Sequence, residues 1–353
     1  MPRAISNVHV KSARALISPA DLAKELPLSE TAAETVAIAR EEVCRIIEGR
    51  DRRLVVVVGP CSIHDLGMAK EYADYLSAER KRLSRHLLIL MRVYFEKPRT
   101  SLGWKGLIND PHLDGSYDME TGLRLGRGLL RDLAERGLPA ASEVLDPISP
   151  QYLAELISWA AIGARTIESQ THREMASGLS MPIGFKNGTD GTLQSAVNAM
   201  KSARQPHHFL GVDPDGRVAM IGTTGNKDTH LVLRGGVSGP NFEESHVRAA
   251  ADALRAMSLC PRVMVDCSHD NSSKDYSRQP EVASALAVQL RRGVDLLGVM
   301  IESNLVAGKQ AFPPANGQSL LYGQSITDGC VDLATTTGML EQMAEAVEAR
   351  PAG

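Results

Sequence analysis

The apolar run Leu54–Val58 (LVVVV), followed by Gly59–Asp65 (GPCSIHD), constrains the fold more than any other stretch. A short, continuous apolar run is typical of a parallel strand that is buried on both faces. In an open doubly wound sheet, a glycine-rich dinucleotide-binding turn would follow such a strand. Gly59–Asp65 contains no such pattern. The stretch therefore favours the first strand of a closed barrel.

Seven further apolar runs follow along the chain, and helical segments lie between most of them. The eight expected strands are Leu54–Val58, Leu87–Val93, Ala140–Leu145, Ala164–Glu168, Ile183–Lys186, His230–Arg234, Val263–Cys267 and Leu297–Glu302. The expected helices are Gly67–Arg82, Met119–Glu135, Gln151–Ala160, Arg173–Leu179, Leu193–Ala203, Phe242–Met257 and Glu281–Arg291. Eight strands that alternate with helices predict an α/β protein with a (β/α)8 TIM barrel.

Two segments lie outside this alternation. Residues 1–52 are expected to form an N-terminal extension with one helix that begins at Ser18-Pro19 and a second, amphipathic helix that ends near Gly49. Asp213–Gly216 (DPDG) predicts a β-hairpin, inserted at about residues 207–223 into a catalytic barrel of residues 53–353. Because a catalytic barrel needs neither segment, we expect them to form an allosteric pocket and a subunit contact. A homodimer and a homotetramer both stay open.

Composition excludes several classes of protein. A net charge of −3 argues against general nucleic-acid binding, which needs a basic excess. No apolar run approaches the length of roughly 18–20 residues that a membrane span requires. The five cysteines are an odd number at irregular spacing, which is not a disulfide framework. We therefore expect a cytoplasmic enzyme without a nucleic-acid or membrane partner.

Basic side chains lie at or just beyond the ends of several expected strands, where the active sites of TIM barrels form. These cations are Arg92, Lys97, Arg99, Arg165, Lys186 and Arg234. Burying so many positive charges together is unfavourable unless anions neutralise them. Phosphate and carboxylate are their natural complements. The pattern predicts one multiply anionic substrate or two anionic substrates.

A second group of side chains could hold a metal ion. Its members are Cys61, His269, Glu302 and Asp328. Thiolate, imidazole and carboxylate ligands together suit a divalent transition metal such as Mn, Fe, Co or Zn. Cys61 follows the first strand, His269 follows the seventh and Glu302 ends the eighth. These strands are neighbours in a closed barrel, and Asp328 lies in the loop beyond. The sequence thus predicts a Lewis acid beside an anion-binding site.

Several of these segments are similar to the microbial class I 3-deoxy-D-arabino-heptulosonate 7-phosphate (DAHP) synthases. The similar motifs are Gly59–Ser62, Lys97–Thr100, Gly103–Gly106, Gly163–Thr166, Glu168–Gln170, Gly184–Gly188 and Ser268-His269. The resemblance covers essentially the whole chain and is to the branch that aromatic amino acids regulate. Asp146-Pro147 and Thr171–Met175 look nearest to the Tyr-sensitive members. Asp270 departs from the pattern, because glycine or alanine is usual there.

The resemblance implies a transferase (3-deoxy-7-phosphoheptulonate synthase) that performs the first step of the shikimate pathway, towards chorismate and the aromatic amino acids. Phosphoenolpyruvate, D-erythrose 4-phosphate and water would give DAHP and phosphate. The residues that the resemblance implies for binding phosphoenolpyruvate are Arg92, Lys97, Glu143, Ala164, Arg165, Lys186 and Arg234. Arg99 and Thr100 are implied to hold the phosphate of erythrose 4-phosphate.

The resemblance also implies metal ligands, a proton donor and an effector site. The implied metal ligands are Cys61, His269, Glu302 and Asp328. Either Lys97 or His269 could protonate the new alkoxide, and the sequence does not choose between them. A feedback-inhibiting Phe, Tyr or Trp would bind among Pro150, Gln151, Met175, Leu179, Ser180, Phe209 and Ile221. Whether Cys61 can pair with Cys330 stays open.

Three alternative functions remain. A 3-deoxy-D-manno-octulosonate 8-phosphate synthase would use a pentose phosphate on the same barrel. A Schiff-base aldolase would use Lys186 as its nucleophile, which would leave the metal ligands idle. A non-catalytic protein that senses aromatic amino acids would have degraded binding positions, whereas all of them are intact here.

Overall fold

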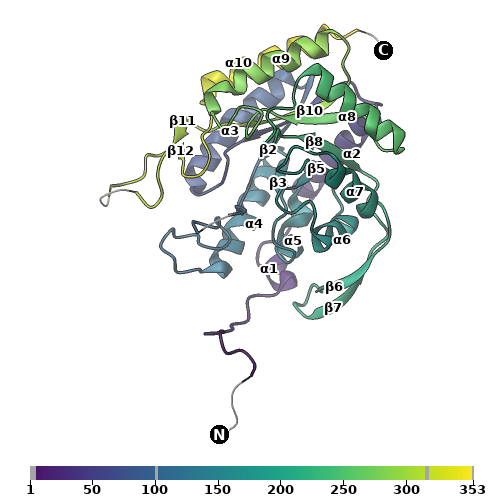
Figure 1. Ribbon diagram of the computed structural model, residues 1–353. Coiled ribbons are helices and arrows are strands. Elements are labelled where there is room, and N and C mark those ends of the chain that lie inside the picture. The colour runs from purple at the N-terminus through teal and green to yellow at the C-terminus, as the bar shows by residue number, and fades with distance from the viewer. Residues whose placement is uncertain (1–4, 100–101, 315–317, 352–353) are drawn as a thin grey trace.

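A computed structural model describes residues 5–99, 102–314 and 318–351 (Figure 1). Eight parallel strands close into a barrel in the order β1-β10-β9-β8-β5-β4-β3-β2, which confirms the predicted TIM barrel. The barrel strands are β1 (Leu54–Gly59), β2 (Leu87–Arg92), β3 (Ala140–Glu143), β4 (Trp159–Ile162), β5 (Ile183–Lys186), β8 (Thr229–Leu233), β9 (Val263–Asp266) and β10 (Leu296–Glu302).

Helices surround the barrel and connect its strands (Figure 1). They are α3 (Leu66–Leu83), α4 (Met119–Glu135), α5 (Pro150–Leu153), α6 (Gln170–Gly178), α7 (Gln194–Ala203), α8 (Glu244–Ala256), α9 (Gln279–Arg291) and α10 (Leu333–Glu348). A 3₁₀ turn, η1 (Ala154–Leu156), extends α5, and another, η2 (Tyr276–Arg278), precedes α9. The sequence analysis did not predict α10, which packs beside α9. Its Asp332 side chain accepts a hydrogen bond from the backbone N–H of Thr335 and caps the helix.

The predicted position of the fourth strand is wrong. The strand is β4, Trp159–Ile162, not Ala164–Glu168, and the helical turns expected over Gln151–Ala160 end at Leu156. Every residue of β4 is apolar and buried between β3 and β5. The expected segment contains charged side chains, which a strand buried on both faces does not accommodate. Short apolar runs look alike in a strand and in a buried helix, which explains the error.

The helix α2 (Glu30–Ile47) closes the amino-terminal end of the barrel. Its Val43, Ile46 and Ile47 join the cluster of apolar side chains that fills the barrel interior. Arg40 fixes the helix by donating to the carbonyl oxygens of Ala154 (2.7 Å) and Ile157 (3.0 Å). The amphipathic face that the sequence predicted is therefore covered by this chain's own barrel.

The helix α1 (Pro19–Glu25) lies next to the inserted hairpin of β6 (His208–Val212) and β7 (Val218–Gly222) (Figure 1). The backbone N–H of Ala20 donates to the carbonyl oxygen of Pro214 at 2.8 Å, in the turn of the hairpin. The hairpin is antiparallel, as the sequence predicted. A second small sheet, which the sequence did not indicate, pairs β11 (Val306–Lys309) with β12 (Gln324–Ser325). No helix in the described part of the chain is long and apolar enough to cross a membrane.

A buried tryptophan–histidine pair lies within the barrel wall. Trp159 Nε1 donates to His230 Nε2 at 2.9 Å, and both residues are fully buried. Burial lowers the pKa of His230 to about 4. In the unfolded chain the same imidazole takes up a proton below about pH 6.5. Because the unfolded state then binds more protons, the free energy of unfolding decreases as the pH falls from about 6.5 towards 4.

This pair predicts a pH-dependent stability. On acidification from pH 7 to pH 5, His230 should cost the folded state about 2 kcal/mol. His230→Gln keeps a hydrogen-bond acceptor for Trp159 but does not titrate. Between pH 7 and pH 5, the free energy of unfolding of this variant should therefore decrease by about 2 kcal/mol less than that of the wild type. Urea denaturation of both proteins at the two pH values measures the difference. An identical pH dependence in the two proteins would contradict the buried neutral histidine.

Candidate active site at the carboxyl end of the barrel

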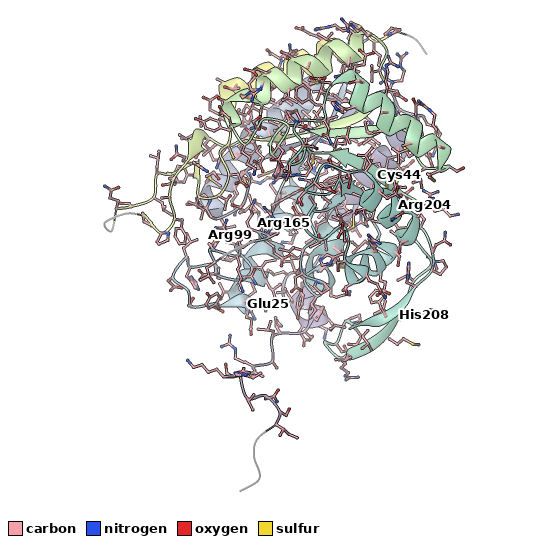
Figure 2. The ribbon with its side chains drawn as sticks, in the orientation of Figure 1. Glu25, Cys44, Arg99, Arg165, Arg204 and His208 are labelled. Carbon is pink, nitrogen blue, oxygen red and sulfur yellow. The ribbon has the colours of Figure 1, made fainter. Side chains whose placement is uncertain are left out.

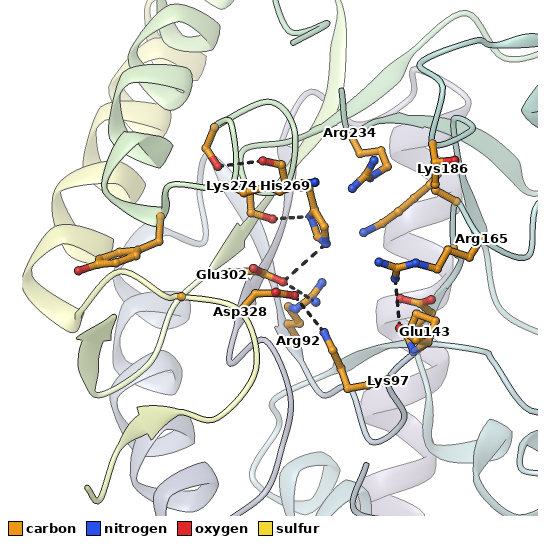
Figure 3. A pocket seen from close by; sticks show the side chains of 18 of the residues that line it. Arg92, Lys97, Glu143, Arg165, Lys186, Arg234, His269, Lys274, Glu302 and Asp328 are labelled. Carbon is orange, nitrogen blue, oxygen red and sulfur yellow. Dashed lines mark hydrogen bonds and ion pairs between the residues drawn. The ribbon is translucent and has the colours of Figure 1, made fainter. Parts of the chain in front are cut away.

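A cavity of about 230 Å³ opens at the carboxyl ends of the barrel strands (Figure 3). All six cations that the sequence predicted line it, namely Arg92, Lys97, Arg99, Arg165, Lys186 and Arg234. Glu143, Ala164, His269, Glu302 and Asp328 line it as well. The predicted Thr100 lies outside the described residues. The structure thus gathers around one cavity side chains that are far apart in the sequence.

The side chains divide into two groups that face each other. In Figure 3, Arg165, Lys186 and Arg234 point into the cavity from one side. His269, Glu302 and Asp328 approach from the other. This division places groups that suit an anion opposite groups that suit a metal ion.

Three of the four predicted metal ligands form one cluster of donor atoms, and the fourth, His269, lies beside it. Cys61 Sγ and one carboxylate oxygen each of Glu302 and Asp328 lie within 4.8 Å of one another. His269 Nε2 is 3.9 Å from Glu302 Oε1. Register explains part of this geometry, because Gly59 pairs with Glu302 across β1 and β10, and Cys61 follows two residues later.

The charges around this group fit a metal ion. Burial and the nearby Glu302 raise the pKa of the Cys61 thiol to about 12, although Lys97 Nζ donates to Cys61 Sγ at 2.9 Å. A thiol in this position stays protonated at neutral pH unless a stronger positive charge stabilises the thiolate. A divalent ion would provide that charge. Sulfur, imidazole and carboxylate donors together match the ligand preferences of Mn, Fe, Co or Zn.

Asp266, at the end of β9, links the two groups. Its Oδ2 accepts a hydrogen bond from Lys186 Nζ at 2.9 Å and lies 2.9 Å from His269 Nδ1. Lys186 and His269 hold the pKa of the Asp266 carboxyl well below its usual range, against the effect of burial. With Nδ1 turned to Asp266, the Nε2 atom of His269 faces Glu302 and the cavity. A carboxylate that orients a histidine in this way is typical of metal sites.

Asp266 was not among the site residues predicted from the sequence. A signal was present, because this aspartate ends the otherwise apolar strand Val263–Asp266, and polar residues at the carboxyl ends of barrel strands are typical of active sites. Other lining residues had no such signal. Lys274 lies in a loop, Tyr276 begins η2 and Lys309 ends β11, and neither of these two short elements was predicted from the sequence.

Most of the cations on the anion side are held by acidic groups. Lys186 pairs with Asp266 at 2.9 Å, and Arg234 Nη1 lies 2.5 Å from Asp270 Oδ2. Asp270, the departure from the family pattern, therefore contacts the anion-binding group. Arg92 pairs with Glu302 at 2.9 Å, yet its buried Nη1 has no hydrogen-bond partner among the described residues. That unsatisfied donor is suited to an incoming anion.

Arg99 and Arg165 lie at the mouth of the barrel (Figure 2). Arg165 lies in the turn after β4, instead of at a strand end as predicted, and its Nη1 donates to the carbonyl oxygen of Pro98 at 3.2 Å. Gly163, at the start of this turn, lies close to the Glu143 side chain. A Cβ atom on Gly163 would lie 2.2 Å from Glu143 Oε1, so a larger residue would displace the Glu143 carboxylate from the cavity.

The residues predicted to bind an effector occupy several neighbouring elements. Phe209 and Ile221 lie opposite each other in the hairpin register. A hydrogen bond of 2.6 Å between the hydroxyls of Ser177 and Thr223 joins the hairpin strand to α6, the helix that contains Met175 and precedes Leu179. Pro150 and Ser180 line two different cavities, and Gln151 is exposed. The predicted effector residues thus belong to several elements, and no single cavity among those described encloses them.

Residues 25–341 match the DAHP synthetase I family. The Tyr-sensitive phospho-2-dehydro-3-deoxyheptonate aldolase of Escherichia coli (strain K12) is 51% identical over 341 residues, which cover 96% of this chain and 95% of that protein. The Phe-sensitive enzyme of the same strain is 51% identical over 345 residues, which cover 98% of each chain. The equal identities do not separate Tyr from Phe sensitivity.

The fold also matches a solved structure, that of phospho-2-dehydro-3-deoxyheptonate aldolase from Francisella tularensis SCHU S4. The TM-score is 0.95 at 53% sequence identity, and the match covers 97% of this chain and 100% of the other. Sequence and fold thus lead to the same set of relatives.

Proposed function

Because this chain belongs to the DAHP synthetase I family, we propose that it condenses phosphoenolpyruvate with D-erythrose 4-phosphate and water, and releases DAHP and phosphate. The reaction opens the route to chorismate and the aromatic amino acids. One observation carries the proposal: a single cavity holds a metal-ligand group on one side and an anion-binding group on the other. The reaction needs both, since it joins two phosphorylated anions through an aldehyde.

The anion side binds and orients phosphoenolpyruvate. Arg92, Lys186 and Arg234 reach the cavity from the barrel wall, and Arg165 reaches it from the turn after β4. The buried ion pairs of Arg92 and Lys186 fix these cations before the substrate arrives. Such preorganisation lowers the cost of ordering the site on binding. Arg99, with Thr100, receives the phosphate of erythrose 4-phosphate at the mouth.

Cys61, His269, Glu302 and Asp328 would hold a divalent ion, which would supply a Lewis acid for the aldehyde oxygen. Lys97 is placed to give a proton to the oxygen of the new hydroxyl group. Its Nζ lies 2.9 Å from Cys61 Sγ and 3.5 Å from Asp328 Oδ2. Burial opposes the charge of Lys97, but these acidic neighbours raise its pKa, which keeps the donor protonated. His269 is less suited, because its Nδ1 lies beside Asp266 and its Nε2 is the nitrogen that would bind the metal.

A substrate test separates this proposal from its alternatives. Purified protein with a divalent metal and phosphoenolpyruvate should release phosphate with erythrose 4-phosphate, and much more slowly with arabinose 5-phosphate. Preference for the pentose phosphate would favour an octulosonate synthase. The Nζ atom of Lys186 is engaged in its ion pair with Asp266, so borohydride should trap no Schiff base. Trapping of Lys186, or release of no phosphate at all, would contradict the proposed reaction.

We further propose that an aromatic amino acid inhibits the enzyme, with a lean towards Tyr, in a cytoplasmic homodimer or homotetramer. The residues on the outer face of the hairpin support a subunit contact, since Leu210, Val218 and Met220 are 83%, 79% and 75% exposed. All five cysteines are free in the described chain, which suits a reducing compartment.

The N-terminal extension should transmit this inhibition. Tyr152 in α5 donates a hydrogen bond from its hydroxyl to the carbonyl oxygen of Ile17 at 2.7 Å, next to the expected effector residues Pro150 and Gln151. Deletion of residues 1–30 should therefore relieve inhibition by more than about tenfold in effector concentration, an effect of the size usual for allosteric coupling. Tyr152→Phe removes only one hydrogen bond and should relieve it partly. Inhibition curves with Tyr, Phe and Trp measure both effects, and unchanged inhibition in the deletion variant would contradict the role of the extension.

A further inference from the structure

The turn that carries Lys97 and Arg99 is held at its stem. Glu96 and Gly106 form an isolated antiparallel bridge, and the backbone N–H of Lys97 donates to the carbonyl oxygen of Lys105 at 2.9 Å. A Cβ atom on Gly106 would lie 2.0 Å from the carbonyl oxygen of Phe95, so the two sides of the stem are in close contact. A small displacement of the backbone at Glu96 should therefore displace Lys97 as well.

Glu96 is buried, and one side chain holds it. The residue is 6% exposed, and Ser149 Oγ donates to Glu96 Oε2 at 2.9 Å. Ser149 is 8% exposed and directly precedes α5. The two residues line a small cavity with apolar neighbours that include Phe95, Ile108 and Met181. The bond therefore joins the stem of the turn to a different part of the barrel, 53 residues along the chain.

No cation neutralises Glu96 among the described residues. The titratable groups that face it are Glu143, at the end of β3, and Asp146, in the loop before α5. Both are acidic, and the other side chains of the cavity are apolar or hydroxylic. Burial, assisted by these two carboxylates, raises the pKa of Glu96 to about 7. The reaction as described above gives this carboxyl group no role.

We propose that Glu96 and Ser149 form a positioning pair that sets the turn bearing Lys97 and Arg99, and thereby the affinity of the site for the aldose phosphate. The inference rests on the proposed function. Neither residue reaches the substrates, because both act through the stem of the turn. Of the five cations expected to bind phosphoenolpyruvate, only Lys97 belongs to this turn, so the affinity for phosphoenolpyruvate should respond much less than that for the aldose phosphate.

Ser149→Ala tests the hydrogen bond. Loss of one such bond should raise the KM for erythrose 4-phosphate about 2- to 10-fold. The KM for phosphoenolpyruvate should stay within about twofold of the wild-type value. Ser142→Ala is the matched control, since Ser142 lines the same cavity but donates to the carbonyl oxygen of Val93 at 2.7 Å. Ser149→Thr retains the hydroxyl and should keep the wild-type KM, which identifies the bond and not the packing as the cause.

Glu96→Gln tests the charge. Above about pH 7, ionised Glu96 adds an unneutralised charge beside two acids and should displace the turn. The wild-type KM for erythrose 4-phosphate should therefore rise with pH more steeply than that of Glu96→Gln, which stays neutral and still accepts from Ser149. Kinetics from pH 6 to pH 8.5 with both substrates measure this difference.

Three results would overturn the inference: parallel pH profiles, equal changes in both KM values, or the same shift in Ser142→Ala. A wild-type protein that does not condense the two substrates would instead refute the proposed function. The two failures are therefore distinguishable in one set of measurements.

Discussion

Cys61→Ala should abolish the condensation while leaving the barrel folded. Cys61 is fully buried and is the only soft ligand of the predicted metal group in the described structure. Without the sulfur, the remaining imidazole and carboxylates bind a transition metal less tightly. The loss of a Lewis acid that stabilises the developing alkoxide is worth several kcal/mol, so kcat should fall at least about 10³-fold.

Metal content and turnover of the variant should be measured together. Cys267→Ala provides the control, because Cys267 is also fully buried, directly follows β9 and is not among the clustered metal donors. The control should keep its metal and its activity, with a modest loss of stability. A Cys61→Ala protein that turns over at the wild-type rate would show that the sulfur is not part of the catalytic site.

Asp266→Asn should weaken the metal site and the anion site at once. The substitution keeps the shape of the side chain but removes the charge that faces both Lys186 and His269. Loss of a carboxylate that orients a metal-bound histidine typically costs about 10- to 100-fold in metal affinity. An unpaired buried Lys186 should also lower the free energy of unfolding by about 3–5 kcal/mol. The KM for phosphoenolpyruvate should rise.

The control for this variant lies at the other end of the barrel. Asp295 pairs with the buried Arg262 at 2.7 Å, so Asp295→Asn removes an ion pair without touching the cavity. Asp295→Asn should lower the free energy of unfolding but leave the metal affinity unchanged. A competition assay with a chelating dye measures the metal affinity. If Asp266→Asn bound metal as tightly as the wild type, Asp266 would not orient His269.

The barrel could be predicted from the sequence because parallel strands buried on both faces leave continuous apolar runs. Leu54–Val58 and Ile183–Lys186 are found within one residue of their predicted bounds. The strand Trp159–Ile162 was predicted in the wrong place, because four apolar residues are too few to show the periodicity of a strand or a helix. The first two of them were therefore assigned to the helix predicted before them. The helix α10 lies in a segment for which no helix was predicted, although Asp332 gives it a clear amino-terminal cap.

The candidate site could be predicted where side chains end strands, because the topology then brings them together. Glu302 and Cys61 meet through the pairing of β1 with β10, and Lys186 ends β5. Residues outside the barrel strands, such as Lys309 at the end of β11, could not be placed, since the paths of these segments depend on tertiary contacts. The hydrogen bond between Ser149 and Glu96 could not be predicted from the sequence either, because a carboxyl group is recognised as buried only once its neighbours are known.

The arrangement of the metal ligands is the centre of this account, and anomalous diffraction from crystals soaked with Mn²⁺ tests it most directly. We expect one peak at bonding distance, about 2.0–2.5 Å, from Cys61 Sγ, His269 Nε2 and a carboxylate oxygen each of Glu302 and Asp328. The absence of a peak there, or a metal that Cys61 and His269 do not share, would contradict it.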